Sequence, residues 1–263
     1  MIVIGEKING AIARVSRAIR ERDADYIAGL AKRQEQAGAN YLDVFAGVAP
    51  RYELEALKWL VDVTEAAVDL PLCLDSHNPK LLVELMGCTS RPGIVNFVSG
   101  ESGKCEVLLP AIAELGWEFI ALTCDDEGIP SEPERKAEIG FKIMEQANRF
   151  GITEERVYID AIALSLTAFD DAVLSFCEAI QLLREKYPAA HYMSGLSNVS
   201  YGLPERSRIN SGFLTYASAC GMDTAIMDPT DRELHSAVLV ADALLGKDPG
   251  CRRYNRAFRL GEL

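Results

Sequence analysis

The sequence has few residues of the kinds that build metal, redox or disulfide sites. It contains three histidines, and its seven cysteines are dispersed and form no C-x-x-C pair. This pattern argues against a disulfide framework and against a cysteine-rich zinc site. We therefore expect a cytoplasmic protein, kept in a reducing compartment, whose site needs no metal ion.

Long apolar runs and an excess of basic residues are also absent. No stretch of about 18 uncharged apolar residues occurs, so we expect no membrane span. The start of the chain is apolar but has no basic region before it, which argues against a signal peptide. The net charge of −12 argues against nucleic acid and against an anionic membrane surface as partners, although local basic patches are compatible with it. We expect neither as a partner.

What is present is a repeated alternation of short apolar runs with amphipathic segments. The runs are apolar throughout, as expected for parallel strands buried on both faces. Eight such units in 263 residues predict a single α/β domain over residues 1–263, a closed (β/α)8 TIM barrel. The predicted strands are 2–4, 41–44, 70–74, 93–96, 118–122, 156–160, 191–196 and 223–227. The predicted helices are 23–37, 53–67, 78–87, 102–115, 131–150, 168–186, 206–220 and 229–245.

The main alternative fold is an open, doubly wound sheet. That fold usually carries a G-x-G-x-x-G phosphate turn after its first strand. Here the first strand leads into residues 5–10, GEKING, which do not match the pattern. The tail over residues 250–263 is basic for its size, and we expect it to pack over the barrel or to serve an interface.

Polar residues close most of the predicted strands. Function in this fold sits at the carboxyl ends of the strands, so these residues are the candidates for a site. Asp75, Asn96 and Asp160 each follow at least two apolar residues directly, and we expect them to project into the mouth of the barrel. Asp228 precedes a proline, and its simplest interpretation is a helix N-cap. The strand-end residues are Glu6, Asp43, Asp75, Asn96, Thr123, Asp125, Asp160, Asn198 and Asp228.

Two carboxylates and a carboxamide suit a particular ligand edge. Carboxylates accept hydrogen bonds, and an asparagine side chain both donates and accepts. Their complement is a flat heterocycle with adjacent ring N–H and amino donors and a carbonyl, such as a 2-amino-4-oxo-pteridine. A divalent metal is the competing ligand. The histidines do not support a metal site, since His77 is predicted to start a helix and His235 to lie inside one.

The sequence resembles a known family along its whole length. It is similar to the methyltetrahydrofolate:corrinoid-protein methyltransferases, which are pterin-binding barrels related to dihydropteroate synthase and to the folate domain of cobalamin-dependent methionine synthase. GLSNVS followed by the RSRIN segment is the most specific match. The matching segments are 4–9, 36–44, 72–76, 95–96, 158–160, 195–200, 208–214 and 219–228.

The resemblance implies roles for the strand-end residues. Asp75, Asn96 and Asp160 match the residues that bind the pyrimidine edge of the pterin, and Glu6 matches an acidic residue beside it. The substrate is then tetrahydrofolate or 5-methyltetrahydrofolate. The methyl group moves between its N5 and a corrinoid (cobalamin) carried by a separate partner protein, and the family also implies a homodimer.

The loop after the seventh strand carries the chemistry in this resemblance. Asn198 matches the asparagine that approaches N5, and Gly195 and Ser197 belong to the same loop. Asn198 cannot act as an acid, but its amide can stabilise the N5–H form within a network that includes water and Asp160 or Asp75. Arg206 matches an arginine near the anionic aminobenzoyl-glutamate side of folate, where a cation suits the tail.

The sequence departs from the family pattern in two places. Phe45 stands where relatives often have asparagine, and the loop over residues 201–204 has no close match. One alternative function is that of dihydropteroate synthase, which needs a lysine near strand seven and an R-x-H pattern near strand eight. Residues 196–198 and 227–229 read LSN and MDP instead. A non-catalytic pterin-binding subunit and an unrelated barrel enzyme stay open as well, as does the direction of transfer.

Overall fold

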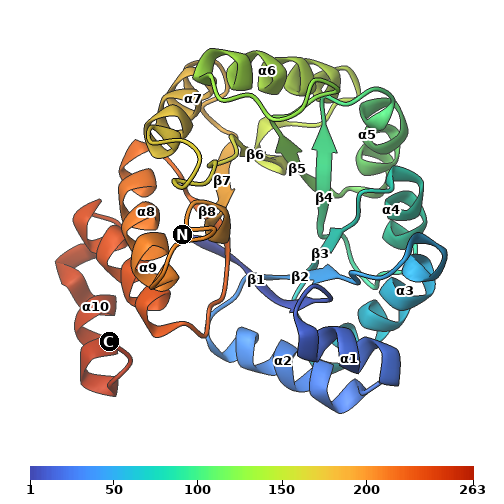
Figure 1. Cartoon of the computed structure of the whole chain (residues 1–263), viewed down its shortest axis with the longest axis horizontal. Coiled ribbons are helices and arrows are strands. Elements are labelled where there is room, and N and C mark those ends of the chain that lie inside the picture. Colours follow the sequence, from blue (N-terminus) through green and yellow to red (C-terminus); the bar gives the residue numbers. More distant parts are fainter.

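A computed structural model describes residues 1–263, in which eight parallel strands close into one barrel in sequence order (Figure 1). Each strand pairs with the next, and the first pairs with the eighth. The prediction of a (β/α)8 barrel is confirmed. The strands are β1 (Ile2–Asn9), β2 (Tyr41–Phe45), β3 (Leu72–Asp75), β4 (Ile94–Ser99), β5 (Glu118–Leu122), β6 (Val157–Asp160), β7 (His191–Gly195) and β8 (Thr224–Met227).

Two strands run further than their apolar runs. β1 continues past Glu6 to Asn9, and β4 continues past Asn96 to Ser99. The prediction that these strands end at Glu6 and Asn96 is therefore wrong. The register shifts between Gly5 and Ile8 in β1 and between Val95 and Val98 in β4. Such bulges re-aim side chains and occur often beside active sites, so both polar residues sit at irregular points of their strands.

All eight predicted helices are present, with shifts of a few residues at their ends. Three of the helices begin with proline at an N-terminal position, where its missing N–H costs nothing. The helices are α1 (Ala13–Glu21), α2 (Ala24–Gln36), α3 (Pro50–Ala67), α4 (Pro79–Met86), α5 (Lys104–Leu115), α6 (Pro133–Arg149), α7 (Ala172–Lys186), α8 (Arg206–Cys220), α9 (Arg232–Leu244) and α10 (Arg252–Leu260). Short 3-10 turns form η1 (Glu154–Arg156), η2 (Leu196–Asn198) and η3 (Pro249–Cys251).

Two helices, α1 and α10, were not predicted. α1 buries a single stripe of Val15, Ala18 and Ile19, which is too short to stand out in the pattern. α10 buries only Ala257 and otherwise exposes its basic residues. It packs against α9 outside the ring of helices, at the lower left of Figure 1, and not over the barrel mouth. Arg253 Nη1 reaches Asp242 Oδ2 at 2.6 Å and ties the tail to α9.

The interior of the barrel is filled by side chains and offers no pore. A separate apolar cluster occupies it, distinct from the larger core between strands and helices. Because this cluster fills the lower barrel, polar groups at the carboxyl ends of the strands rest on an apolar floor. The members of the inner cluster are Ile4, Cys73, Ile94, Ile120, Tyr158 and Met193.

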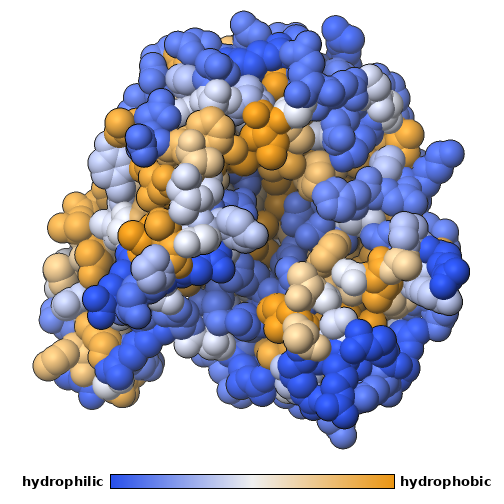
Figure 2. All heavy atoms as spheres, viewed as in Figure 1, coloured by the Kyte–Doolittle hydropathy of each residue, from blue (hydrophilic) through white to orange (hydrophobic).

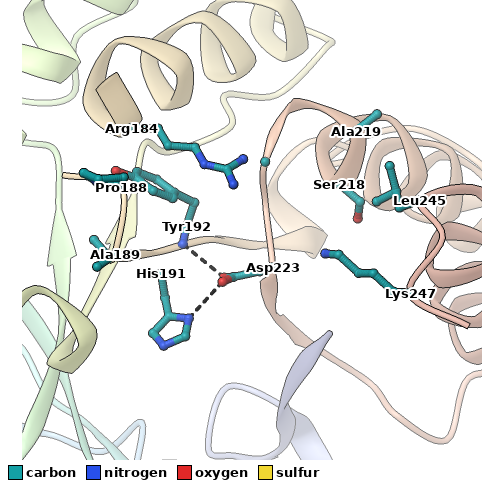
Figure 3. A pocket seen from close by; sticks show the side chains of 12 residues that line it. Arg184, Pro188, Ala189, His191, Tyr192, Ser218, Ala219, Asp223, Leu245 and Lys247 are labelled. Atoms are coloured by element: carbon teal, nitrogen blue, oxygen red, sulfur yellow. Dashed lines mark hydrogen bonds and ion pairs between the residues drawn. The ribbon is translucent and has the colours of Figure 1, made fainter. Parts of the chain in front are cut away.

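The amino-terminal end of the barrel carries its own polar network. Tyr41 and Tyr158 both donate to Glu118 Oε2, at 2.9 and 3.0 Å. The Tyr158 ring stacks on His191 with centroids 4.7 Å apart, and His191 Nδ1 lies 2.9 Å from Asp223 Oδ2. These last two residues line a cavity of 350 Å³ at the start of β7 and β8 (Figure 3). It lies at the opposite end of the barrel from the predicted site.

The ion pair of His191 and Asp223 predicts a pH-dependent stability. The hydrogen bond to Asp223 raises the pKa of His191. Burial acts to raise the pKa of Asp223, but its hydrogen bonds to His191, Thr224 and the Tyr192 N–H outweigh burial and lower it. The stabilisation from protonated His191 is fully present below the pKa that this histidine has in the unfolded chain. It is lost as pH rises through the higher pKa of the folded protein. The stabilisation from ionised Asp223 is lost as pH falls and the carboxylate gains a proton. The pair therefore stabilises the folded protein most between about pH 4 and 6.5.

We expect His191→Gln to lower the free energy of unfolding by about 0.5–1 kcal/mol more at pH 6 than at pH 8.5. The difference is small because solvent screens this partly exposed pair. Urea unfolding at the two pH values measures the difference. His235→Gln on α9 is the matched control and should show none. Equal losses for His191→Gln at both pH values would mean that the ring contributes through its stacking on Tyr158 alone.

Candidate active site at the mouth of the barrel

Asp75 and Asn96 lie side by side at the mouth, as predicted. They are directly opposite each other in the register of β3 and β4. Asn96 Nδ2 donates to Asp43 Oδ1 at 3.1 Å. Because Asp43 is on β2, two strands away from β4, this bond passes over β3 on the inside of the barrel. The structure thus gathers an amide and two carboxylates into one cluster.

The carboxylates of this cluster are poorly solvated. Burial raises the pKa of Asp43 to about 6, against the hydrogen bonds from Asn96 and Cys73. Burial and then the negative charges of Asp43 and Glu53 raise the pKa of Asp75 well above its usual range. Two neighbouring buried carboxyl groups are not easily ionised at the same time. A ligand that donates hydrogen bonds to them would stabilise their charged forms. The cluster therefore suits a donor-rich heterocycle.

Asp160 ends β6 and is buried, with 6% of its surface exposed. Its Oδ1 accepts from the Ile162 N–H at 2.7 Å. Burial raises its pKa to about 6, while hydrogen bonds from the backbones of Ile162 and Gly195 and the charge of Lys136 act in the opposite direction. Asp160 is thus joined to Gly195, the last residue of β7, and it is ionised above about pH 6.

Glu6 and Ser197 meet across the closure of the barrel. Ser197 Oγ donates to Glu6 Oε1 at 3.3 Å. Burial raises the pKa of Glu6 to about 7, with Lys7 lowering it and Asp228 raising it to smaller extents. At neutral pH this side chain therefore exists both protonated and ionised. A group of this kind can hold or release a proton for a bound substrate.

The interpretation of Asp228 as a helix N-cap is wrong. Its carboxylate lies 3.0 Å from Lys7 Nζ and accepts from the Thr230 N–H at 2.9 Å, which closes a turn. The cap of α9 is Asp231, which accepts from the N–H groups of residues 233 and 234. Asp228 thus holds Lys7 beside Glu6 at the mouth.

The β7 loop presents Asn198 to solvent. Asn198 is exposed and its side chain has no hydrogen-bond partner within the chain, so its amide is available to a ligand. Arg206 opens α8 and turns back to this loop. Its Nε donates to Ser200 Oγ at 3.0 Å and its Nη2 donates to the Ser197 carbonyl at 2.5 Å. Arg206 thus fixes the loop that carries Ser197 and Asn198. Its predicted role at the substrate tail stays a prediction.

Two charged residues, Lys7 and Lys136, were missed, and Asp43 was a candidate to which no role was given. The role of Asp43 could have been suspected, because a carboxylate inside a run that is buried on both faces needs a partner. Lys7 was hidden because β1 was expected to end before it. Lys136 on α6 gave no signal in the helical pattern, although its side chain is fully buried. No group of three His, Cys, Asp or Glu side chains is placed to hold a metal ion.

Comparison with known proteins decides the family. The family model described as pterin binding enzyme matches residues 5–228, from β1 to the end of β8. The chain belongs to the pterin-binding enzymes. This pterin-binding enzyme is 46% identical to the methylcorrinoid:tetrahydrofolate methyltransferase of Eubacterium limosum, over 100% of this chain and 98% of the relative. It is 28% identical to methionine synthase of Mycobacterium tuberculosis, over 86% of this chain but 20% of that much longer protein.

Solved structures confirm the fold of this pterin-binding enzyme. A dihydropteroate synthase from Xanthomonas albilineans in complex with 7,8-dihydropteroate matches with a TM-score of 0.71 and 17% identity, over 93% of this chain and 92% of that one. The dihydropteroate synthase of Yersinia pestis with a sulfonamide drug matches with a TM-score of 0.71 and 15% identity, over 94% of each chain. At such low sequence identity the similarity shows only that the chains share the barrel fold. None of the helices is long and apolar enough to cross a membrane.

Proposed function

We propose that this enzyme transfers a methyl group between N5 of tetrahydrofolate and a corrinoid that is bound to a separate protein. The observation that carries the proposal is the identity of 46% over the whole chain to a methylcorrinoid:tetrahydrofolate methyltransferase. The name of that relative puts the methyl group on the corrinoid first. We propose the same direction here, with 5-methyltetrahydrofolate as the product.

The pterin edge binds to the acidic cluster and to Asp160 in this proposal. A 2-amino-4-oxo pyrimidine edge offers ring N–H and amino donors, and Asp75 and Asp160 supply carboxylate acceptors for them. Asn96 already donates to Asp43, so its carbonyl oxygen and its second N–H remain for the ligand. Hydrogen bonds made in a poorly solvated site are stronger than in water. This places the plane of the pterin over the apolar floor of the barrel.

The chemistry at N5 is mainly a matter of one proton. When tetrahydrofolate accepts the methyl group, the N5–C bond forms as the cobalt–carbon bond of the methylcorrinoid substrate breaks. The bonding electron pair stays on cobalt, which passes from Co(III) to Co(I), and the N5 proton must leave. The corrinoid on its own protein supplies the methyl group. Asn198 orients N5 and stabilises the changing charge through its amide. Glu6, with its pKa of about 7 and its hydrogen bond to Ser197, can take up the released proton.

A direct assay tests this function. The purified enzyme is mixed with tetrahydrofolate and free methylcob(III)alamin, and 5-methyltetrahydrofolate is quantified by chromatography while the cobalamin spectrum is followed. We expect product formation coupled to the loss of the methylcobalamin spectrum. Pterin binding without product would favour the non-catalytic subunit, and dihydropteroate formation from a pterin pyrophosphate and 4-aminobenzoate would favour the synthase. Either outcome would overturn the proposal.

We further propose that residues 1–263 act as one domain, in the cytoplasm, as a homodimer that docks a corrinoid protein. All seven cysteines are free, which suits a reducing compartment. Leu244 and Phe258 are each 73% exposed on α9 and α10, and hydrophobic atoms gather over this part of the surface at the lower left of Figure 2. An exposed apolar surface of this kind favours an interface between two copies.

A further inference from the structure

Lys136 is a buried cation that the proposed chemistry does not use. It lies on α6, its surface is 0% exposed, and no other lysine or arginine is buried. Its Nζ donates to the Ile162 carbonyl at 3.1 Å and to Ser175 Oγ at 3.3 Å. Neither partner is an acid. Burying a lysine without a paired carboxylate is costly, so its presence needs a reason other than stability.

The contact of Lys136 is with a strained turn. Ile162 has φ of +49°, in the left-handed region that a β-branched residue rarely adopts. Its backbone is held from both sides, because the Ile162 N–H donates to Asp160 Oδ1 at 2.7 Å and its carbonyl accepts from Lys136. Strained conformations persist where the surroundings over-determine them, and they gather at functional sites. The turn after β6 therefore joins Lys136 to Asp160 through one residue.

We propose that Lys136 is a positioning residue that fixes the turn after β6 and aims the Asp160 carboxylate at the pterin. The inference rests on the proposed function, because it takes Asp160 as a pterin ligand. Ser175 on α7 completes the arrangement, since its Oγ donates to the Ser131 carbonyl at 2.5 Å. The lysine thus ties α6 and α7 to the turn, and no direct contact with the substrate is needed.

The charge of Lys136 also favours the ionised form of Asp160. The charged groups that act on the lysine are Asp160 on β6, Asp171 before α7 and Glu132 before α6. The groups that act on Asp160 are the backbones of Ile162 and Gly195 and the charge of Lys136. Burial lowers the pKa of Lys136 to about 8, so it is still mostly charged at neutral pH. Without this positive charge the effect of burial is less opposed, and the pKa of Asp160 should rise further.

Two variants separate the charge from the hydrogen bond. Lys136→Gln keeps a donor for the Ile162 carbonyl without a charge, and Lys136→Met keeps neither. Tetrahydrofolate affinity is measured by calorimetry from pH 5.5 to 8.5. We expect both variants to raise the midpoint of the acid limb by about one pH unit, the low end of the range for losing a nearby opposite charge. At pH 8.5 Lys136→Gln should approach wild-type affinity, while Lys136→Met should stay about tenfold weaker, on the order of one lost hydrogen bond.

The controls distinguish a positioning role from a structural one. Lys142→Met replaces a lysine on the same helix that is not buried, and it should leave the pH profile unchanged. A lower unfolding temperature with a wild-type acid limb in Lys136→Gln would overturn the inference. If Lys136→Met does not fold, Lys136→Gln decides alone. Asp160→Asn is the reference: full affinity in that variant would overturn the pterin site itself, whereas lost affinity there with no shift in Lys136→Gln would overturn only the role of Lys136.

Discussion

Replacing Asn198 with alanine should slow methyl transfer about a hundredfold, the usual effect of removing one preorganised donor from a transition state. The affinity for tetrahydrofolate should change by less than about threefold, because the pterin edge is held elsewhere. Asn198 lies on η2, is exposed and has no side-chain hydrogen bond within the chain, so alanine breaks no internal hydrogen bond. Its supports, Ser197 and Arg206, remain in place. The loss should therefore fall on the rate of the chemical step and not on substrate binding.

Single-turnover kinetics and calorimetry measure the two quantities for Asn198→Ala separately. Asn148→Ala, at an exposed asparagine on α6, is the matched control and should leave both unchanged. Equal losses of rate and affinity would make Asn198 a general binding residue. A wild-type rate would remove it from the chemistry altogether.

The second large effect is expected from Asp160→Asn. This change keeps the size of the side chain but removes a buried carboxylate. Hydrogen bonds to a charged group contribute about 1.5–3 kcal/mol, so tetrahydrofolate affinity at pH 7.5 should fall about ten- to hundredfold. The rate of transfer should fall as well, because a loosely held pterin presents N5 less accurately.

The pH dependence provides a sharper test of Asp160. Its pKa is about 6, so the wild-type enzyme should lose affinity as pH falls through this value and the carboxylate gains a proton. In Asp160→Asn this acid limb should be absent or reduced. Asp170→Asn, in the same loop but exposed, serves as the control and should keep the wild-type profile. An unchanged affinity in Asp160→Asn at every pH would exclude this carboxylate from the site.

The sequence was sufficient to predict the barrel because its strands are buried on both faces. A parallel strand covered by helices outside and by core inside must be apolar along its length, which a local pattern reveals. The same pattern could not reveal where β1 and β4 end. Both continue through bulges after Gly5 and Val95, and pairing with a neighbouring strand, not local hydrophobicity, keeps them in the sheet. The helices α1 and α10 were not predicted because each buries few apolar side chains.

The candidate site divides in the same way. Asp75, Asn96 and Asp160 could be predicted from one rule, since each closes or nearly closes an apolar run at the functional end of the barrel. Asp43 and Lys136 act through partners that are distant in sequence. The bond from Asn96 to Asp43 spans 53 positions and that from Lys136 to Ile162 spans 26. Only the closed fold brings such pairs together, so the sequence alone could not identify the partners of Asp43 and Lys136.

The contact between Ser197 and Glu6 spans 191 positions of the chain. It forms only when the last strands have docked against the first, because β1 pairs with β8 to complete the ring. The part of the mouth that we propose handles the proton therefore cannot assemble until the strands from both ends of the barrel are present. Contacts of such long sequence separation are slow to form. A barrel that is not yet closed would hold the acidic cluster of β2 to β4 but lack this contact, so under the proposed mechanism activity should appear only after ring closure.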